Sequence, residues 1–337
     1  MNGISVIICC YNSSLRLPVT LDHLIKQQNL GTIPWEIIII NNNSSDNTVE
    51  IANTILCNTS INYKIIDEPK PGIFYARITG IKESTYDVLI FVDDDNWLCE
   101  DYLKIAYQIM KNNPTVGLCG GVGNGAFEVE PPKWFKQYEG FYAIGDHKRT
   151  IEGILPKASS FLYGAGLVLR KQAYLELTNK GFKPLLVGRE GKSLNSGDDS
   201  ELCAAINIIG WNSYFSRDLK FSHFIPKSRL TEDYFNQLLK GLSNSSQICT
   251  IYNLVLQKKK PLCFYYLRKF IKNHIDILLI ILRKSKTLNT NTINTYHVEK
   301  LFLKYIIQNN YKNILKLNHY MRIIKSLSIN NSVLEKN

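Results

Sequence analysis

The first part of the chain alternates short apolar runs with segments in which apolar residues recur at helical spacing. Runs of consecutive apolar residues are typical of strands that are buried on both faces of a sheet. The order strand, helix, strand, helix, strand, helix, strand predicts an α/β fold with a mainly parallel central sheet flanked by helices. The strands are expected in "ISVIICC", "EIIIIN", "YKIID" and "DVLIFV", and the helices in "SSLRLPVTLDHLIKQQ", "SSDNTVEIANTIL" and "GIFYARITGIKES".

The pattern is less regular in the second part of the chain. "EDYLKIAYQIMKNNP" predicts a helix that stops at Asn113-Pro114, and "TVGLCGGVGNG" predicts a strand that runs into a glycine-rich loop. A helix is expected in "DDSELCAAINIIG", a late strand in "SYFSRDLKFSHF", and mostly helical structure from Thr231. We therefore predict one α/β domain over residues 1–240 and a helical C-terminal extension over residues 241–337.

Composition favours a globular protein of the cytoplasm. The chain has 337 residues, 45% of them hydrophobic, which is ample for a buried core. Its eight cysteines form no C-x-x-C pair and are interpreted as reduced thiols. The N-terminus has no basic region before its short apolar stretch, so it is expected to form a strand rather than a targeting segment. No apolar run approaches the roughly 20 residues that span a bilayer.

Positive charge is concentrated in the extension. The net charge is +11, and lysine and arginine greatly outnumber acidic residues after residue 250. Such asymmetry indicates an anionic partner, either nucleic acid or an anionic membrane surface. No nucleic-acid-binding motif is present, whereas "FYYLRKFIKNHIDILLIILRKS" suits a helix that lies in a membrane interface. A helical subdomain that packs on the core with a solvated basic face remains an equal alternative.

Three consecutive aspartates, Asp93, Asp94 and Asp95, follow the fourth predicted strand. One of them would suffice to cap a helix that begins near Asn96. Three neighbouring carboxylates repel one another unless a cation lies among them, and Mg²⁺ and similar hard cations bind carboxylate and phosphate oxygens. Because ligands of parallel sheets bind at the carboxyl ends of the strands, this triplet predicts a site for Mn²⁺ or Mg²⁺ with a nucleotide.

A second acidic pair lies in "NSGDDSELC". Ser196 and Asp199 have the spacing of a capping box at a helix start. The same stretch places Asp198 and Asp199 where a general base could take a proton from a substrate. Both interpretations remain open from the sequence.

Basic and aromatic residues offer further candidates. His223 is followed by Lys227 and Arg229, so this stretch is either a metal or phosphate contact or a structural one. Arg77 either faces the strand ends or lies exposed on its helix. Five aromatic residues either form a platform for an acceptor sugar or fold onto the core: Trp134, Phe135, Tyr138, Phe141 and Tyr142.

Taken in order, these motifs resemble family 2 glycosyltransferases, which have the GT-A (nucleotide-diphospho-sugar transferase) fold. The resemblance covers roughly residues 3–240. It implies an inverting enzyme that uses a nucleotide-diphospho-sugar, most often UDP-linked, with Mn²⁺ or Mg²⁺. It also implies a glycan or lipid-linked acceptor and a role in bacterial surface polysaccharide synthesis. The motifs that carry it are "SVIICCYN", "EIIIINNNSSDNT", "PGIFYARITGI", "LIFVDDDN" and "SGDDSEL".

The resemblance assigns expected roles on the donor side. Cys10, Tyr11 and Asn12 would line the nucleotide, and Arg77 would face the same site. Asn41 stands where the family has an aspartate that contacts the base, which leaves the choice of base open.

The same resemblance assigns roles around the diphosphate and the acceptor. Asp93 would contact ribose or metal, Asp94 would position the nucleotide, and Asp95 would hold the metal. His223 and Arg229 would reach the metal and the diphosphate. Asp199 is the expected general base, with Asp198 beside it.

Other classes fit the sequence less well. A sugar nucleotidyltransferase would carry a glycine-rich phosphate loop after the first strand, and "YNSSLRLPVT" has no glycine. A processive synthase would carry membrane spans and a late Q-x-x-R-W stretch, which are not found. The alternative from another class is a non-catalytic protein that binds a nucleotide sugar or a glycan on a GT-A-like shell.

Overall fold

The computed structural model describes residues 1–146, 149–157, 160–189, 196–257, 320 and 323–327. The expected strands of the first part are present, and further strands follow them. In chain order they are β1 (Ile4–Cys10), β2 (Trp35–Asn41), β3 (Asn62–Asp67), β4 (Val88–Asp93), β5 (Asn96–Leu98), β6 (Val116–Phe127), β7 (Gly153–Ile154), β8 (Val168–Arg170) and β9 (Asn212–Ile225).

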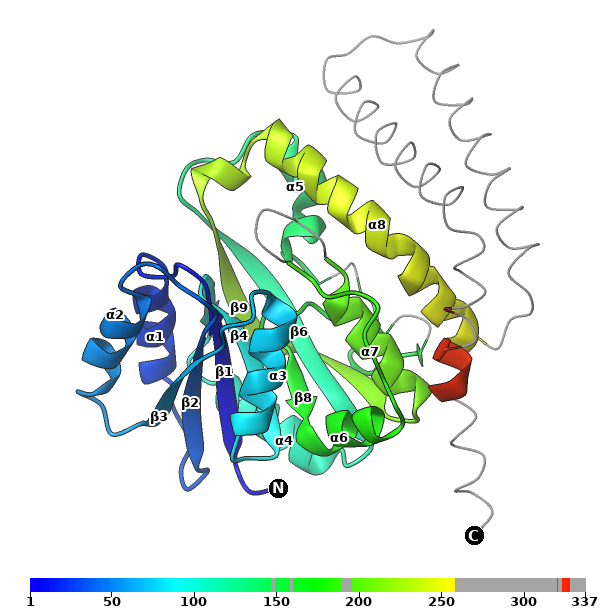
Figure 1. The fold of residues 1–337 in the computed structure, drawn as a ribbon, viewed down its shortest axis with the longest axis horizontal. Helices are drawn as coiled ribbons and strands as arrows, with labels where there is room; N and C mark the ends of the chain where they lie inside the picture. The colour runs from blue at the N-terminus through cyan, green and yellow to red at the C-terminus, as the bar shows by residue number, and fades with distance from the viewer. Residues whose placement is uncertain (147–148, 158–159, 190–195, 258–319, 321–322, 328–337) are drawn as a thin grey trace, which may run out of the picture.

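Helices connect and cover these strands (Figure 1). Most lie within a few residues of the segments whose apolar periodicity predicted them. They are α1 (Leu17–Ile25), α2 (Thr48–Leu56), α3 (Ile73–Glu83), α4 (Tyr102–Asn112), α5 (Phe135–Tyr138), α6 (Lys171–Asn179), α7 (Asp198–Ile208) and α8 (Glu232–Leu256), with 3₁₀ turns η1 (Glu139–Tyr142) and η3 (Lys227–Arg229).

All described strands join one sheet, in the order β3-β2-β1-β4-β8-β6-β9-β5, with β7 paired to β9. The strands from β3 to β4 are parallel, as the alternating pattern predicted. β8 enters antiparallel between β4 and β6, and β6 and β9 are again parallel. The carboxyl ends of β1, β2, β3 and β4 therefore meet at one edge of the sheet, where the candidate residues follow them.

The sheet is buried on both faces, which explains its continuous apolar runs. Ile7 of β1 packs in a cluster with residues of α3, α6 and α7. Val6 and Ile8 of the same strand point the other way, into a cluster with residues of α1, α2 and α4. Alternate side chains of one strand thus fill two core layers.

The glycine-rich stretch was expected to form a loop, and this prediction is wrong, because β6 continues through it to Phe127. The glycines allow neighbouring backbone to approach closely. A Cβ atom at Gly121 would lie 1.8 Å from the carbonyl oxygen of Leu219, and one at Gly123 would lie 1.9 Å from that of Ala143.

A side chain at Gly121 is therefore expected to destabilise the sheet. Gly121→Ala should lower the free energy of unfolding by about 1–3 kcal/mol, because β9 must shift to relieve the overlap. Chemical denaturation would measure the change. Gly140→Ala is a matched control, since the nearest atom to its Cβ would be 3.8 Å away. Equal stability of the two variants would contradict the packing argument.

The helical prediction from Thr231 is confirmed where the chain is described. The Thr231 hydroxyl accepts a hydrogen bond from the Tyr234 amide and caps α8. α8 continues without a break past residue 240, and the 1–240 and 241–337 division stays a prediction. Most of the basic segment, including residues 258–319, lies outside the described residues. Among the residues described, no helix is long and apolar enough to cross a membrane.

Candidate active site

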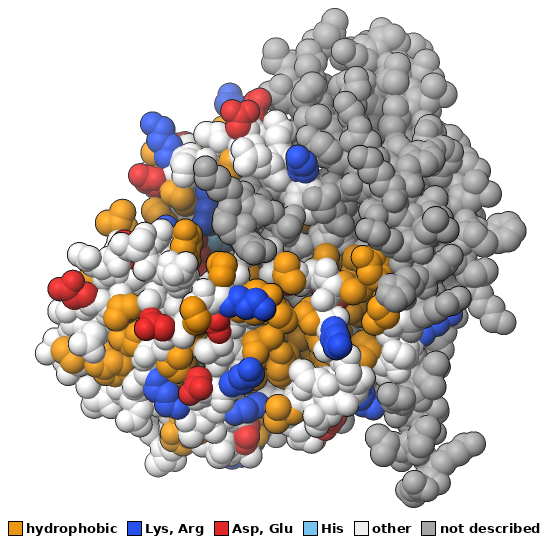
Figure 2. Space-filling view, viewed as in Figure 1, with side chains coloured by type: hydrophobic (Ala, Val, Ile, Leu, Met, Phe, Trp, Pro, Cys, Tyr) orange, Lys and Arg blue, Asp and Glu red, His pale blue; other side chains and the backbone are white. Residues whose placement is uncertain are grey.

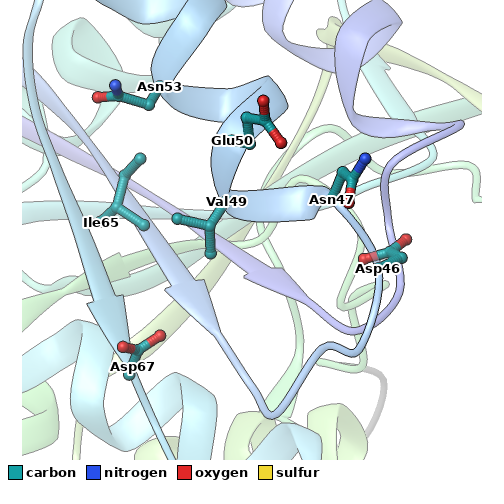
Figure 3. Close-up of a pocket in the computed structure, with 7 residues that line it drawn as sticks. All are labelled: Asp46, Asn47, Val49, Glu50, Asn53, Ile65 and Asp67. Atoms are coloured by element: carbon teal, nitrogen blue, oxygen red, sulfur yellow. The ribbon is translucent and has the colours of Figure 1, made fainter.

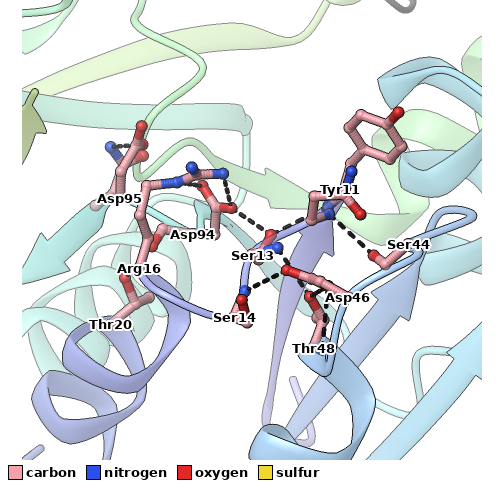
Figure 4. Close-up of polar contacts among 12 residues, drawn as sticks. Tyr11, Ser13, Ser14, Arg16, Thr20, Ser44, Asp46, Thr48, Asp94 and Asp95 are labelled. Carbon is pink, nitrogen blue, oxygen red and sulfur yellow. Dashed lines mark hydrogen bonds and ion pairs between the residues drawn. The ribbon is translucent and has the colours of Figure 1, made fainter. Parts of the chain in front are cut away.

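The three aspartates at the end of β4 point to different partners. A short strand, β5, follows them instead of a helix, so the capping interpretation is wrong. Asp94 accepts hydrogen bonds from the Ser13 hydroxyl and from Arg16, whose Nη2 lies 2.6 Å away (Figure 4). Asp94 is therefore engaged with the loop that follows β1.

That loop is held by a polar network between β1 and α2 (Figure 4). The Ser13 amide donates to the Thr48 hydroxyl, and the Ser14 amide donates to Asp46. Asn12 adopts a positive φ of 50° and accepts a hydrogen bond from the Ser45 amide.

The network leaves Tyr11 on the surface, 56% exposed at the edge of the sheet, where an aromatic ring can meet a planar base. The Cys10 side chain is buried in the core, so Cys10 can offer a ligand only its backbone.

Asp95 is the most enclosed charge of the triplet, with 4% of its surface exposed. Its Oδ2 lies 2.9 Å from Arg229 Nη1, and its Oδ1 lies 3.5 Å from His223 Nε2. Burial alone would raise the pKa of this carboxyl, but its interactions with His223 and Arg229 outweigh burial and hold the pKa below its usual value. Asp95 is thus ionised and already paired with Arg229.

The orientation of His223 is fixed by the aromatic segment. Its Nδ1 donates a hydrogen bond of 2.6 Å to the Tyr142 carbonyl oxygen, and its Nε2 lies 3.4 Å from Arg229 Nη1. A ring that donates through Nδ1 presents the lone pair of Nε2 to a ligand. β9 places this ring over the triplet because His223 pairs with Asn96 of β5.

The aromatic segment itself folds onto the core. Phe135 and Tyr142 are buried, and Trp134 stacks on Phe235 of α8 with ring centres 5.2 Å apart. Phe141 is the most exposed of the five aromatic residues, at 41%. The segment therefore supports His223, as the core interpretation predicted, and leaves little aromatic surface for an acceptor sugar.

The second acidic pair opens α7, and no capping box forms there. Gly197 is the N-cap residue with a φ of 100°, and it makes no side-chain cap. The Asp199 carboxylate instead accepts hydrogen bonds from the amides of Gly164, at 3.0 Å, and Ser200, at 2.7 Å. Burial, with the adjacent negative charge of Asp198, raises the pKa of Asp199 to about 6. This value suits a general base near neutral pH.

Arg77 lies between the two acidic clusters. Its Nη1 is 2.5 Å from Asp198 Oδ2, and its side chain is 16% exposed, so it is not an ordinary surface arginine. Its charge also acts on Asp93, whose pKa burial raises and Arg77 lowers. The Asp93 carboxylate accepts no hydrogen bond from any residue that the structure describes. Arg77 thus links Asp93 of the triplet to the second acidic pair.

Figure 2 shows a hollow at this edge, in which basic, histidine and acidic side chains are visible. Sequence reasoning missed one of its contributors. Arg189 is exposed, and its charge lowers the pKa of both Asp93 and Asp95. The only signal for it was an arginine in the Gly/Ser/Lys-rich stretch before the second acidic pair.

Asn41 is paired across the sheet edge. Its Nδ2 donates to Asp67 Oδ1 at 2.7 Å, and its Oδ1 accepts from the Ser44 amide. Asp67 also lines a groove of about 540 Å³ beside α2 (Figure 3). The groove contains neither acidic cluster of the candidate site, and its own carboxylates, on Asp46, Glu50 and Asp67, would repel a diphosphate. We therefore do not place a donor diphosphate there.

The residues present fit a divalent cation. Asp95, Asp93 and the Nε2 of His223 offer the oxygen and imidazole ligands that Mn²⁺ and Mg²⁺ accept. Within the described part of the chain, no three acidic, histidine or cysteine side chains are close enough to hold a metal by themselves. Phosphate oxygens of a substrate would therefore have to complete the coordination.

Asp198 and Arg77 carry opposite charges beside Asp199, so removing either charge should shift the pH dependence of kcat/KM in opposite directions. If Asp199 is a general base, it acts only when ionised, so kcat/KM should rise with pH through about 6. Asp198→Asn removes a charge that raises the pKa of Asp199, so the rise in kcat/KM should occur at lower pH. Arg77→Gln removes a charge that lowers the pKa of Asp199, so the rise should occur at higher pH. Rate profiles between about pH 5 and 8 would show both shifts, and two unmoved profiles would exclude Asp199 as the titrating base.

The fold and this site are typical of a transferase. Comparisons with known proteins identify the family. Residues 5–177 match the model of glycosyl transferase family 2. The chain therefore belongs to glycosyltransferase family 2, which confirms the resemblance seen in its motifs.

Curated relatives match a shorter stretch. Poly-beta-1,6-N-acetyl-D-glucosamine synthase of Staphylococcus epidermidis is 34% identical over 122 residues, and that of Staphylococcus aureus strain COL is 31% identical over 121 residues. Each match covers 36% of this chain and 28% of the relative. The chain thus spans under a third of the length of these relatives.

Solved structures share the fold. TarS 1-349 of S. aureus in complex with UDP has a TM-score of 0.51 and 14% identity, and the match covers 98% of this chain and 88% of the TarS 1-349 chain. The complex with UDP-GlcNAc has a TM-score of 0.50 and 16% identity, with coverages of 72% and 65%. The predicted GT-A fold class is thereby confirmed.

Proposed function

We propose that the protein is an inverting, metal-dependent glycosyltransferase that moves a sugar from a UDP-sugar to a hydroxyl group of a glycan or lipid-linked glycan. The observation that carries this proposal is that two acidic clusters lie on either side of Arg77. The aspartate triplet, with buried Asp95 facing His223 and Arg229, suits a diphosphate and its cation. A separate, half-buried carboxyl, Asp199, has its pKa raised to about 6 and suits an acceptor hydroxyl.

The proposed reaction gives the two acidic clusters separate roles. Asp199 takes the proton of the acceptor hydroxyl, whose oxygen attacks the anomeric carbon from the face opposite the diphosphate. The bond from that carbon to the phosphate oxygen breaks, UDP leaves, and the configuration inverts. Arg229 is placed to stabilise the charge that develops on the leaving diphosphate. When bound, a divalent cation would supply further positive charge there. Asp95, Asp93 and His223 are its candidate ligands, and phosphate oxygens of the donor would have to complete its coordination.

The choice of donor rests on chemistry and on relatives. The ends of β2 and β3 present an amide and a carboxylate, Asn41 and Asp67, which can meet the alternating acceptor and donor atoms of a uracil edge. TarS 1-349 has been solved with UDP and with UDP-GlcNAc. Curated relatives are named as synthases of an N-acetylglucosamine polymer. We therefore propose a UDP-linked N-acetylhexosamine and a role in surface polysaccharide synthesis. The basic segment after residue 250 would hold the enzyme near a lipid-linked acceptor on the inner membrane face.

The product anomer tests this proposal. The full chain would be incubated with UDP-GlcNAc, Mn²⁺ and candidate glycan acceptors, and the product would be analysed by NMR. An α-linked donor should give a β-linked product, with equal amounts of UDP released and sugar transferred. An α-linked product would contradict the inverting mechanism. Release of UDP with water as the only acceptor would contradict transfer to a glycan.

A further inference from the structure

One buried carboxylate near the site has no part in the reaction as proposed. Glu201 lies in the first turn of α7 and is 1% exposed. It accepts hydrogen bonds from the Leu185 amide at 3.0 Å, the Leu186 amide at 2.7 Å and the Tyr252 hydroxyl at 2.9 Å. Burial raises its pKa to about 7, and these three donors limit the rise. A single side chain thus joins α7, the segment before it and α8.

α8 contacts the start of α7 along a defined stripe. Ser245, Cys249 and Tyr252 follow the i, i+4, i+7 spacing of one helix face. A Cβ atom at Gly197 would lie 2.8 Å from the Ser245 Cβ, and Cys249 interacts with the Ser200 side chain. Figure 1 shows α8 running past α7. α8 therefore packs against the first turn of α7, which carries Asp198 and Asp199.

The segment held by Glu201 returns to the site within a few residues. A Cβ atom at Gly188 would lie 2.9 Å from Asp198 Cγ, so the backbone there is packed directly on this carboxylate. The carbonyl oxygen of Arg189 accepts a hydrogen bond of 3.2 Å from the Ile73 amide at the start of α3. Four residues further along α3, Arg77 pairs with Asp198. The three hydrogen bonds at Glu201 therefore anchor one end of a short segment whose other end contacts Asp198 and, through Arg77, whose charge acts on Asp93, is linked to the aspartate triplet.

We propose that Glu201 is a positioning residue. Its hydrogen bonds to Tyr252 of α8 and to the amides of Leu185 and Leu186 fix the first turn of α7 and residues 185–189 in position relative to each other. This inference rests on the proposed function. Held in this way, Asp199 keeps its orientation toward the acceptor and Arg189 keeps its charge toward the triplet. A displacement near 1 Å at a reacting group can cost about 100-fold in rate, so a partial loosening should be visible in kcat.

Two variants of different severity test the role. Tyr252→Phe removes one donor without changing the volume of the core, and Glu201→Gln keeps the size but cannot accept all three hydrogen bonds. Each should lower kcat by about tenfold or more while KM for the UDP-sugar stays within about twofold. Amide hydrogen exchange at Leu185 and Leu186 should quicken in both. Tyr174→Phe, a half-buried tyrosine of α6, is the matched control and should change neither kcat nor exchange at these two amides.

The outcomes separate this role from the proposed function. If both variants exchange faster at Leu185 and Leu186 but keep the wild-type kcat, the contact is merely structural and the positioning role is overturned. If kcat falls without faster exchange, the hydrogen bonds do not hold the segment and the role is also overturned. A wild-type protein that transfers no sugar would instead contradict the proposed function, and with it the role that depends on it.

Discussion

Asp199→Asn is expected to lower kcat by roughly 10²–10⁴-fold, the range that a general base contributes. The substitution keeps the size of the side chain and one acceptor for the amides of Gly164 and Ser200, so the fold should be preserved. It removes the carboxylate that we propose as the general base, whose pKa is about 6. Initial rates of UDP release with a glycan acceptor would measure the loss.

The control for Asp199→Asn is UDP binding. In the proposed mechanism Asp199 takes a proton from the acceptor and does not contact the donor, so calorimetric titration with UDP should give the wild-type affinity for this variant. A variant that keeps more than about a tenth of the wild-type kcat would show that another group takes the proton. A variant that loses UDP affinity would show that Asp199 contributes to the donor site.

Asp95→Asn is expected to have the second large effect, through metal binding. The loss of a direct carboxylate ligand should lower metal affinity by about 100-fold or more, since even residues that only orient ligands contribute 10–100-fold. Removing its charge also leaves Arg229 without its buried partner. The dependence of the transfer rate on Mn²⁺ concentration would measure the change, with melting temperature recorded in parallel.

A surface carboxylate serves as the control for Asp95→Asn. Asp22 forms an exposed ion pair with Lys26 on α1, and Asp22→Asn should leave the Mn²⁺ dependence unchanged. If Asp95→Asn and wild type require the same Mn²⁺ concentration, Asp95 is not a metal ligand. Its role would then be restricted to orienting Arg229 and His223.

The parallel half of the sheet could be predicted from the sequence because its signals are local. Continuous apolar runs predict strands buried on both faces, and the residues that end them must meet at one edge. This rule predicts that the Asp93–Asp95 triplet lies at the edge where ligands of parallel sheets bind. The glycine-rich part of β6 was mispredicted because glycine is a loop signal locally. Here it serves a contact with Leu219, about a hundred residues away.

The sequence alone could not predict which side chains pair with one another across the site. Arg77 and Asp198 are 121 positions apart, and Asp95 and Arg229 are 134 apart. Only the folded sheet shows that each pair is in contact. The capping interpretation of Asp199 failed for a similar reason, because the positive φ of Gly197 turns the chain so that Asp199 meets Gly164 instead.

Calorimetric titration of the full chain with UDP and with GDP, each with and without Mn²⁺, tests the central claim most directly. If the strand ends form a donor site for a nucleotide diphosphate and its cation, UDP should bind more tightly when Mn²⁺ is present and more tightly than GDP. Failure of both nucleotides to bind, with and without metal, would mean that the aspartate triplet is not a donor site. The protein would then be a glycan-binding member of this family rather than a transferase.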